Sequence, residues 1–595
     1  MGRSQAIAAV GLGAVLAGFA PVVAAQSVPA PPPSLPQGSL PTAQEVNPAA
    51  PDAAPPKSTV KVREQGAFRA GPCPLAQSDV KVAIRSITFT GPGGAALDPE
   101  ILRVVQGITT GSDAQSISAV CTLRDEANFR LQHARYVAAV QIPPQTIDQG
   151  VLRLEVVTGR IVEVHVHGDA GPFEGKVRAR IEQLKKLTPL NAAEAEKVLL
   201  QANDIPGLTM QMGLSPDTAT GKPGDLIGDI TVSYRRFALV GNVQNYNSTA
   251  LGRETVYLRA EAYDLLNLDD RAYIAGSTTF DFRKQRTIQF GEAITLNSHN
   301  DHLAFVSTFA QSRPALTGLD LRTVSLIENL SYDHTFVRTT TASVIATGGF
   351  EYAEQRTKVY FAGDKKGQGI GLDRISTLYV RVDADKRLLG LDGSQKAEVS
   401  GGLELRKGIG ILGATKPGVI VGTSSPSRFN GSGTPFIVRG HLSGVVNLGP
   451  LFELASTVQG QWADRELLNY DQFAIGNLTV GRGYDPGANT ADKAFAAASE
   501  ARFNLPLGPR VRGQIYGFYD WIHLWNRDPS STERNRILRS VGGGARLTVI
   551  NGLKLDVTYA HPLDPPLLTG TNVQRSPNRL MVSLTAQLVP FGFKF

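Results

Sequence analysis

Apolar and polar side chains alternate along many short segments of the chain between residues 237 and 595. In residues 255–263, for example, Val256, Leu258, Ala260 and Ala262 occupy every second position. Segments of about ten residues with this alternation, separated by turns, are typical of transmembrane β-barrel strands. Strands in lipid must close on themselves, because an open edge leaves backbone groups unpaired. At about 22 residues per strand and loop, the region predicts a transmembrane β-barrel of about 16 strands. A soluble sandwich or an aqueous barrel is the alternative.

Residues 78–236 show a different pattern, in which strand-like segments are separated by segments of helical period. The order strand, helix, helix, strand, strand occurs twice, which predicts two small α+β domains at residues 78–160 and 161–236. The expected helices are residues 99–106, 113–132, 175–186 and 191–203.

The N-terminus resembles a secretory signal peptide at residues 1–25. Arg3 precedes an apolar core from Ala6 to Phe19, and Val23-Ala24-Ala25 forms a cleavage site of small residues. A membrane anchor is the alternative, which the shortness of that core disfavours. Residues 26–77 are rich in proline and alanine, a composition that predicts a disordered linker. The mature protein is therefore expected outside the cytoplasm, with no transmembrane helix, because no later run of about twenty apolar residues occurs.

The chain contains only two cysteines, Cys73 and Cys121. Disulfides persist in exported proteins, and neither cysteine has another thiol with which to pair. A Cys73–Cys121 disulfide is therefore the favoured interpretation, with two free buried thiols as the alternative.

Composition and motifs argue against several other functions. The net charge of +7 is spread along the chain without a block of Lys or Arg, so nucleic acid is not an expected partner. Neither a zinc-protease motif, a phosphate-binding loop nor a nucleophile elbow occurs, so we expect no catalytic residues, no cofactor and no enzymatic activity. His165 and His167 share one face of a predicted strand, but no third ligand is near, so no metal site is expected.

One glycine-flanked arginine stands out in the strand-rich region. Gly481, Arg482, Gly483 and Tyr484 are followed by Asp485-Pro486-Gly487. Glycines permit backbone angles closed to other residues, so the stretch predicts a tight loop tip that presents Arg482 and Tyr484. A dinucleotide site is disfavoured, because the segment that follows has no apolar helical stripe.

This loop resembles the Arg-Gly-Tyr/Phe signature in the sixth extracellular loop of two-partner secretion transporters of the haemolysin secretion/activation (ShlB/FhaC/HecB) family. Phe518 and Asp520 resemble the family's Phe-x-Asp-x-Gly strand motif, although Ile522 replaces its closing glycine and Gly481 precedes the arginine. Residues 136–145 and 150–161 are similar to the family's first POTRA domain, with Arg135 in place of a usual glycine.

The resemblance implies two POTRA domains, at 78–160 and 161–236, in the periplasm, followed by a 16-stranded transmembrane barrel at 237–595 in the outer membrane. It implies that the loop at 464–494 folds inward and that Arg482 pairs with Asp520 in the lumen. The alternative is that Arg482 lies in solvent as an ordinary charged loop residue. A plug helix, frequent in the family, is doubtful here because the mature chain begins with the linker. A terminal aromatic such as Phe595 is what the barrel-assembly machinery recognises, although Pro590 interrupts the alternation before it.

The implied function is export of a large partner exoprotein, adhesin-like or cytolysin-like, which the POTRA domains bind. The transporter is expected to be a monomer in outer-membrane lipid that uses no ATP. A barrel-assembly insertase and a passive porin-type channel remain as alternatives. The former usually has more POTRA units, and the latter leaves the periplasmic portion unexplained.

Overall fold

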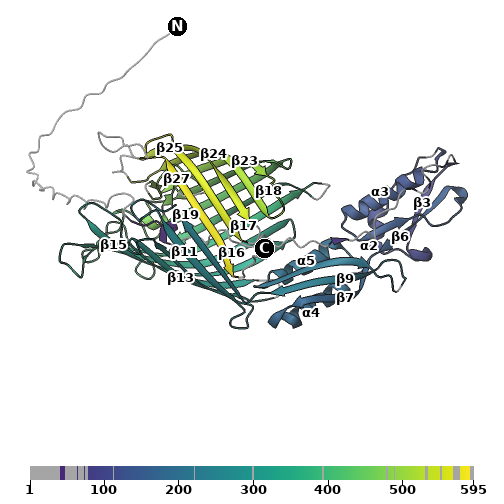
Figure 1. Ribbon diagram of the computed structural model, residues 1–595, viewed down its shortest axis with the longest axis horizontal. Helices are drawn as coiled ribbons and strands as arrows, with labels where there is room; N and C mark the ends of the chain where they lie inside the picture. Colours follow the sequence, from purple (N-terminus) through teal and green to yellow (C-terminus); the bar gives the residue numbers. More distant parts are fainter. Residues whose placement is uncertain are drawn as a thin grey trace, which may run out of the picture.

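The computed structural model describes residues 40–46, 63–64, 73, 75, 78 and 80–589, apart from 112, 220, 298–300, 391–393, 477–479, 488, 529–533, 550–551 and 567–576. A closed antiparallel barrel forms most of it, with two α/β units at one end (Figure 1). The predicted signal peptide, Pro590 and Phe595 lie outside the described residues.

The barrel contains sixteen strands in chain order and closes where the first, β10, pairs with the last, β27. No backbone edge is left open to lipid, as a membrane-spanning sheet requires. The strands are β10 (Phe237–Gln244), β11 (Thr255–Tyr263), β12 (Arg271–Thr279), β13 (Gln285–Thr295), β14 (His302–Ser312), β15 (Asp320–Arg338), β16 (Ala342–Tyr360), β17 (Gln368–Leu389), β18 (Gln395–Gly408), β19 (Phe436–Leu448), β20 (Phe452–Ala463), β23 (Lys493–Leu505), β24 (Val511–Trp525), β25 (Asn535–Val549), β26 (Leu553–Pro562) and β27 (Arg579–Val589).

The alternation in sequence corresponds to the two faces of the barrel wall. On β11, Leu258 is 48% exposed on the outer face, whereas its neighbour Tyr257 is 6% exposed on the inner face. Successive side chains of a strand point to opposite faces, so apolar residues meet lipid and polar ones line the lumen. The predicted barrel is thereby confirmed. Among the described helices, none has the length and apolar character needed to cross a membrane.

The first α/β unit has a three-stranded sheet, ordered β3-β6-β5, under two helices. Its core contains Ile101 and Val105 of α2 and Leu131 of α3, packed on Leu152 and Leu154 of β6. The second long helix begins six residues later than predicted, because β4 pairs with β2 instead of continuing a helix. The elements are β2 (Lys81–Val82), β3 (Ser86–Thr90), η1 (Pro92–Gly94), α2 (Pro99–Val105), β4 (Gln115–Ser116), α3 (Ala119–His133), β5 (Ala138–Gln141), η2 (Asp148–Gly150) and β6 (Val151–Thr158).

The second unit repeats the arrangement with a sheet ordered β1-β8-β9-β7. Phe173, Leu184, Leu199 and Met210 lie in its core. The extra strand β1 comes from the proline-rich region and pairs in parallel with β8. The elements are β1 (Arg63–Glu64), β7 (Arg160–Asp169), η3 (Gly171–Phe173), α4 (Glu174–Lys185), α5 (Ala192–Asn203), β8 (Leu208–Pro216) and β9 (Asp225–Tyr234). Mainly β architecture with two preceding α+β units matches the predicted fold class.

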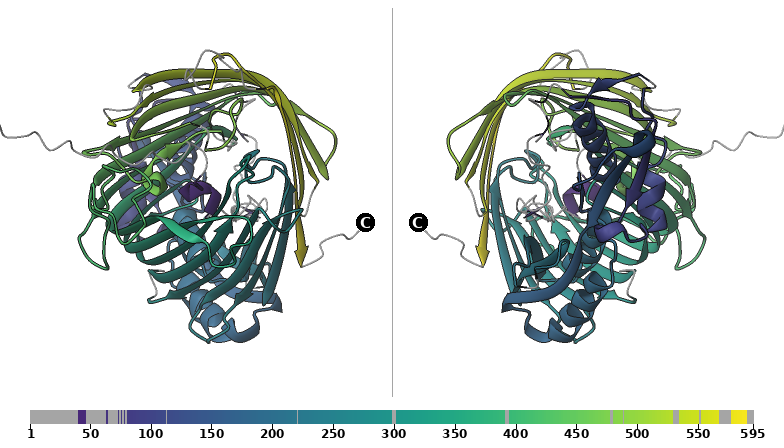
Figure 2. Two further views of the ribbon diagram at one scale, coloured as in Figure 1. Left: turned by 90° about the vertical axis from the view of Figure 1, so that its left-hand side faces the viewer. Right: turned by 90° about the vertical axis from the view of Figure 1, so that its right-hand side faces the viewer.

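The structure differs from the prediction of a disordered linker at residues 40–46, which lie inside the barrel (Figure 2, purple). They include a single helical turn, α1 (Ala43–Val46). Thr42 begins the turn: its backbone N–H and hydroxyl donate to Glu45 Oε2, at 2.9 and 3.0 Å, while its carbonyl accepts from Glu45 N. Thr-x-x-Glu is a capping-box sequence, so a local signal for this turn was present in the chain.

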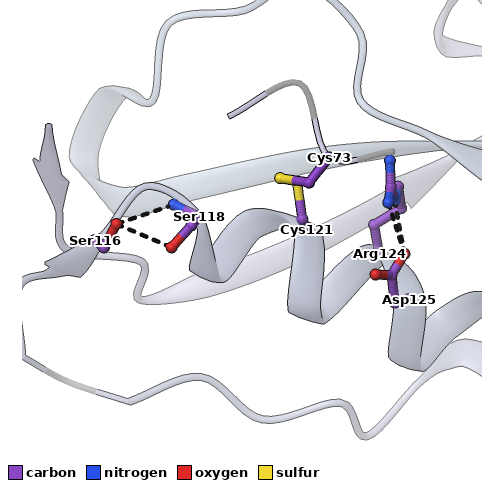
Figure 3. The surroundings of a disulfide bond; sticks show 6 residues. All are labelled: Cys73, Ser116, Ser118, Cys121, Arg124 and Asp125. Atoms are coloured by element: carbon purple, nitrogen blue, oxygen red, sulfur yellow. Dashed lines mark hydrogen bonds and ion pairs between the residues drawn. A yellow bond between two sulfur atoms is a disulfide. The ribbon is translucent and has the colours of Figure 1, made fainter. Parts of the chain in front are cut away.

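Cys73 and Cys121 form a disulfide with Cα atoms 5.7 Å apart (Figure 3). Cys121 lies in the first turn of α3 and is buried. The bond thus attaches the segment before the first sheet to the helix that covers it.

We expect labelling of unfolded, unreduced protein to detect no free thiol, and labelling after reduction to detect two. Reduction should also destabilise the first unit by about 2–4 kcal/mol, because an unfolded chain without the cross-link gains entropy. A Cys73→Ser/Cys121→Ser variant, unresponsive to reductant, is the control for the denaturation measurement. Two labelled thiols before reduction would contradict the pairing.

Candidate functional site

The loop between β20 and β23 folds into the barrel instead of extending outward. It contains η4 (Asn469–Asp471) and a small hairpin of β21 (Phe473–Ala474) and β22 (Thr490–Ala491). Val480, Arg482 and Tyr484 are each at most 2% exposed. A loop whose tip residues are this deeply buried is fixed against the inner wall. The structure therefore differs from the alternative in which Arg482 lies in solvent as an ordinary loop charge.

Arg482 contacts two carboxylates of the barrel wall. Its backbone N–H and Nε donate to Asp520 Oδ2 at 2.9 and 3.2 Å, and its Nη2 donates to Asp520 Oδ1 at 2.6 Å. Its Nη1 donates to Glu500 Oε1 at 2.5 Å. The guanidinium also lies over the Phe518 ring, 3.6 Å from the ring centroid. Phe518 and Asp520 point the same way from β24, as residues two apart on a strand do.

Asp520 is itself fully buried and accepts a further hydrogen bond, at 3.0 Å, from Ser540 Oγ of β25. Charge-assisted, multidentate contacts of this kind are short and directional. A buried ion pair adds little net stability over an apolar core, yet losing one partner costs several kcal/mol because a charge is left unpaired. The arrangement therefore fixes the position of the loop tip.

The two departures from the expected family motifs lie against each other. A Cβ at Gly481 would lie 3.1 Å from Cδ1 of Ile522, the residue that replaces the closing glycine of the strand motif. Gly481 also has φ +73°, a conformation that L side chains rarely adopt. At Gly483, a Cβ would lie 2.7 Å from Cβ of Ser540. The positive φ thus favours glycine at Gly481, and the close approach of the loop to the wall requires glycine at Gly483.

Tyr484 is fully buried among Ile475, Val480, Ile522 and Leu538. Its hydroxyl donates to the carbonyl of Arg539 at 2.7 Å. The same hydroxyl lies 3.2 Å from the carbonyl oxygen of Asp564. The buried ring and these polar contacts hold the end of the motif against β24 and β25.

Two residues of this site carried no recognisable signal in the sequence. Glu500 of β23 accepts hydrogen bonds from Arg482, from Arg502 Nε at 2.8 Å and from Arg546 Nη1 at 3.0 Å. Arg579, at the start of β27, is 2% exposed and donates to the backbone carbonyls of Gly476, Arg482 and Tyr484. A charged residue in an alternating strand looks like ordinary lumen lining, so only the position of the loop reveals these contacts.

The segment 40–46 meets the same loop inside the lumen. Val46 is fully buried with Leu468 and Tyr470 of the loop and Ile327 of the wall. Asn469 Nδ2 donates to the carbonyl of Pro41 at 3.1 Å, and Gln355 Nε2 of β16 donates to the same carbonyl at 3.2 Å. The loop and the N-terminal segment together occupy the lumen.

Deleting residues 40–46 should raise the single-channel conductance of the purified protein in planar lipid bilayers, because the segment takes up space that water and ions would otherwise fill. The Cys73→Ser/Cys121→Ser variant, which is altered in the first α/β unit and not in the lumen, is the control and should leave conductance unchanged. An unaltered conductance in the first variant would show that the segment does not limit the pore.

His165 and His167 lie on β7 beside acidic side chains. His165 Nε2 is 3.2 Å from Glu163 Oε1, and His167 Nε2 is 3.7 Å from Asp229 Oδ1. All four side chains are substantially exposed. Across the part of the chain that the structure describes, no group of three or more His, Cys, Asp or Glu is arranged to hold a metal ion.

The profile of the family described as haemolysin secretion/activation protein ShlB/FhaC/HecB matches residues 230–547, more than half of the chain. The chain belongs to the ShlB/FhaC/HecB family.

Curated relatives and solved structures agree with this membership. The heme/hemopexin transporter protein HuxB of Haemophilus influenzae is 23% identical over 474 residues, which cover 76% of this chain and 78% of HuxB. CdiB from Escherichia coli has a TM-score of 0.62 at 14% identity and covers 87% of this chain and 92% of its own. CdiB from Acinetobacter baumannii has a TM-score of 0.56 at 14% identity, covering 89% and 94%. At these identities the two structures show the shared fold.

As a ShlB/FhaC/HecB family member, the protein is an outer-membrane transporter that secretes partner proteins. Its family consists of transporters, not enzymes. Membership therefore favours secretion over the insertase and porin-type alternatives.

Proposed function

We propose that this transporter recognises one large exoprotein in the periplasm and passes it through the barrel as an extended chain without ATP. In this proposal residues 78–160 and 161–236 are POTRA domains that bind the cargo, and a single chain forms the complete transporter. Folding of the cargo outside the cell supplies the driving force, since nucleotide is absent from the periplasm.

The observation that carries the proposal is the occupied lumen. Two segments that are not part of the wall, the loop at 464–492 and residues 40–46, fill the barrel interior. Both are connected to the wall through side-chain hydrogen bonds and packing, and α1 has no strand pairing with it. Segments held in this way can leave the lumen without breaking the barrel ladder, which gives an exported chain a route.

The second unit offers an edge for cargo recognition. Its strand β8 lies at one side of the sheet, where Arg63 and Glu64 of β1 pair with Gly213 and Leu214 only. Within the rest of β8, the side-chain amide of Asn203 already bonds both the N–H and the carbonyl of Met210. The open edge of this sheet is therefore β7, which pairs with β9 on one side and with no further strand of the described chain on the other. An extended peptide adds to such an edge through main-chain hydrogen bonds. This supports capture of an unfolded cargo segment by strand addition at β7.

Reconstitution tests this proposal. Proteoliposomes that contain the purified full chain and no nucleotide should translocate the large β-rich exoprotein encoded beside it. An exoprotein from an unrelated two-partner system is the control and should remain outside. A requirement for ATP, or equal transport of both exoproteins, would contradict the proposal.

A further inference from the structure

A pocket of about 490 Å³ lies between α4 and the barrel. Four parts of the chain line it: the helix α4, the segment between α5 and β8, the turn after β11 and the turn after β13. The lining residues that bear on its chemistry are Lys176, Arg180, Gln183, Leu268, Asp269 and Leu296.

The pocket lies at the periplasmic rim of the barrel. The chain enters β10 directly from the second α/β unit, so β10 begins at the periplasmic end. Since consecutive strands are antiparallel, β11 and β13 end at that same rim. Figure 1 shows α4 on the outer, lower side of the second unit, close to this rim. The pocket therefore opens where the outer wall of the barrel leaves the membrane.

Arg180 gives the pocket an uncompensated positive charge. Its Nη1 donates to the amide oxygens of Gln183 and Gln201, at 3.1 and 3.0 Å. Both acceptors are neutral, and among the described residues no carboxylate forms an ion pair with Arg180. The other cation that lines the pocket, Lys176, pairs with Asp269. Arg178, which lies on α4 outside the pocket, pairs with Glu174. Burial lowers the pKa of Arg180, as expected for a cation without an acidic partner.

Exposed leucines surround the same opening. Leu265, Leu266 and Leu268 in the turn after β11 are 49–54% exposed, and Leu296 after β13 is 48% exposed. Four large apolar side chains on two periplasmic turns are costly in water and suited to the boundary between headgroups and acyl chains. A cationic pocket beside such a rim matches an amphiphile with an anionic head.

We propose that this pocket binds the phosphate headgroup of an anionic phospholipid of the inner leaflet. Arg180 would donate charge-assisted hydrogen bonds to the phosphate oxygens, and the acyl chains would cover Leu268 and Leu296. A lipid held there touches α4 and both barrel turns at once. It would therefore fix the second α/β unit against the barrel wall.

Native mass spectrometry of the full chain in detergent tests the site with phosphatidylglycerol and phosphatidylcholine as probes. We expect the first phosphatidylglycerol to bind about tenfold more tightly than phosphatidylcholine, the factor that one charge-assisted contact supplies. Arg180→Gln should remove this preference and Arg180→Lys should keep most of it. Arg178→Gln is the matched control, because Arg178 lies on the same helix outside the pocket, and it should retain the preference.

Heat-modifiable migration of each variant checks that the barrel is folded before its lipid binding is compared. Equal affinity of the wild-type chain for both lipids would overturn the proposal, and so would an unchanged preference in Arg180→Gln. Displacement of phosphatidylglycerol by millimolar inorganic phosphate would show a site for free phosphate and would overturn the lipid assignment.

Discussion

Arg482→Ala should abolish most secretion of the partner while the barrel still assembles in the outer membrane. The substitution leaves the buried Asp520 carboxylate without its cation and removes one of the hydrogen bonds to Glu500. Removing one partner of a buried ion pair costs about 3–5 kcal/mol of free energy. The loop tip then loses its fixed position, whereas the ladder of the barrel is untouched. Secretion is measured as exoprotein in the culture medium, and assembly by heat-modifiable migration.

Asp520→Ala should have a smaller effect than Arg482→Ala, because Arg482 keeps its contact with Glu500. If the two residues act as one unit, the double variant should be hardly worse than Arg482→Ala alone. Arg502→Ala is the matched control, since Arg502 also contacts Glu500 from the lumen wall but forms no hydrogen bond or ion pair with the described residues of the loop. Strictly additive losses would mean that Arg482 and Asp520 act separately, and the proposed pairing would then have no functional role.

Deleting residues 78–235 should leave a barrel that inserts into the outer membrane but exports nothing. All sixteen strands of the closed ladder lie after the deletion, so closure does not depend on the two α/β units. Recognition of the cargo, which we assign to those units, would be lost completely. Surface proteolysis and heat-modifiable migration measure insertion, and exoprotein in the medium measures export.

The control for this deletion is a variant that keeps both α/β units but loses one contact between the second unit and the barrel. Arg338 of the β15 end pairs with Asp204 after α5, with Nη2 2.6 Å from Oδ1. Arg338→Ala removes this contact and should retain most export, because the units are still present. Undiminished export by the deletion variant would exclude residues 78–235 from the mechanism.

The sequence by itself determined the barrel, because the alternation of apolar and polar residues within each segment is a local property of a strand. A period of two places Leu258 in lipid and Tyr257 in the lumen whatever the partner strand is. The alternation therefore predicted a barrel, and the length of the region at about 22 residues per strand and loop predicted the number of strands. The two α+β units could also be predicted from the sequence, since segments of strand period and of helical period follow the same order twice before residue 236. Helix starts were less certain: residues 113–118 look helical by themselves, but Gln115 and Ser116 pair with another strand.

The family resemblance predicted the inward loop, whereas only the tertiary structure placed residues 40–46 in the lumen beside it. Residues 40–46 have a proline-rich context with too little apolar surface for a core, yet Val46 is buried because Leu468 and Ile327 supply the surface from far along the chain. Glu500 and Arg579 look like two more polar residues in alternating strands, and they become part of the site only because an inward loop places Arg482 and its carbonyl beside them. The unpaired charge of Arg180 likewise depends on which acids the barrel turns bring to α4. Periodicity records the face on which a side chain lies, whereas contacts between segments hundreds of residues apart arise only when the barrel closes around them.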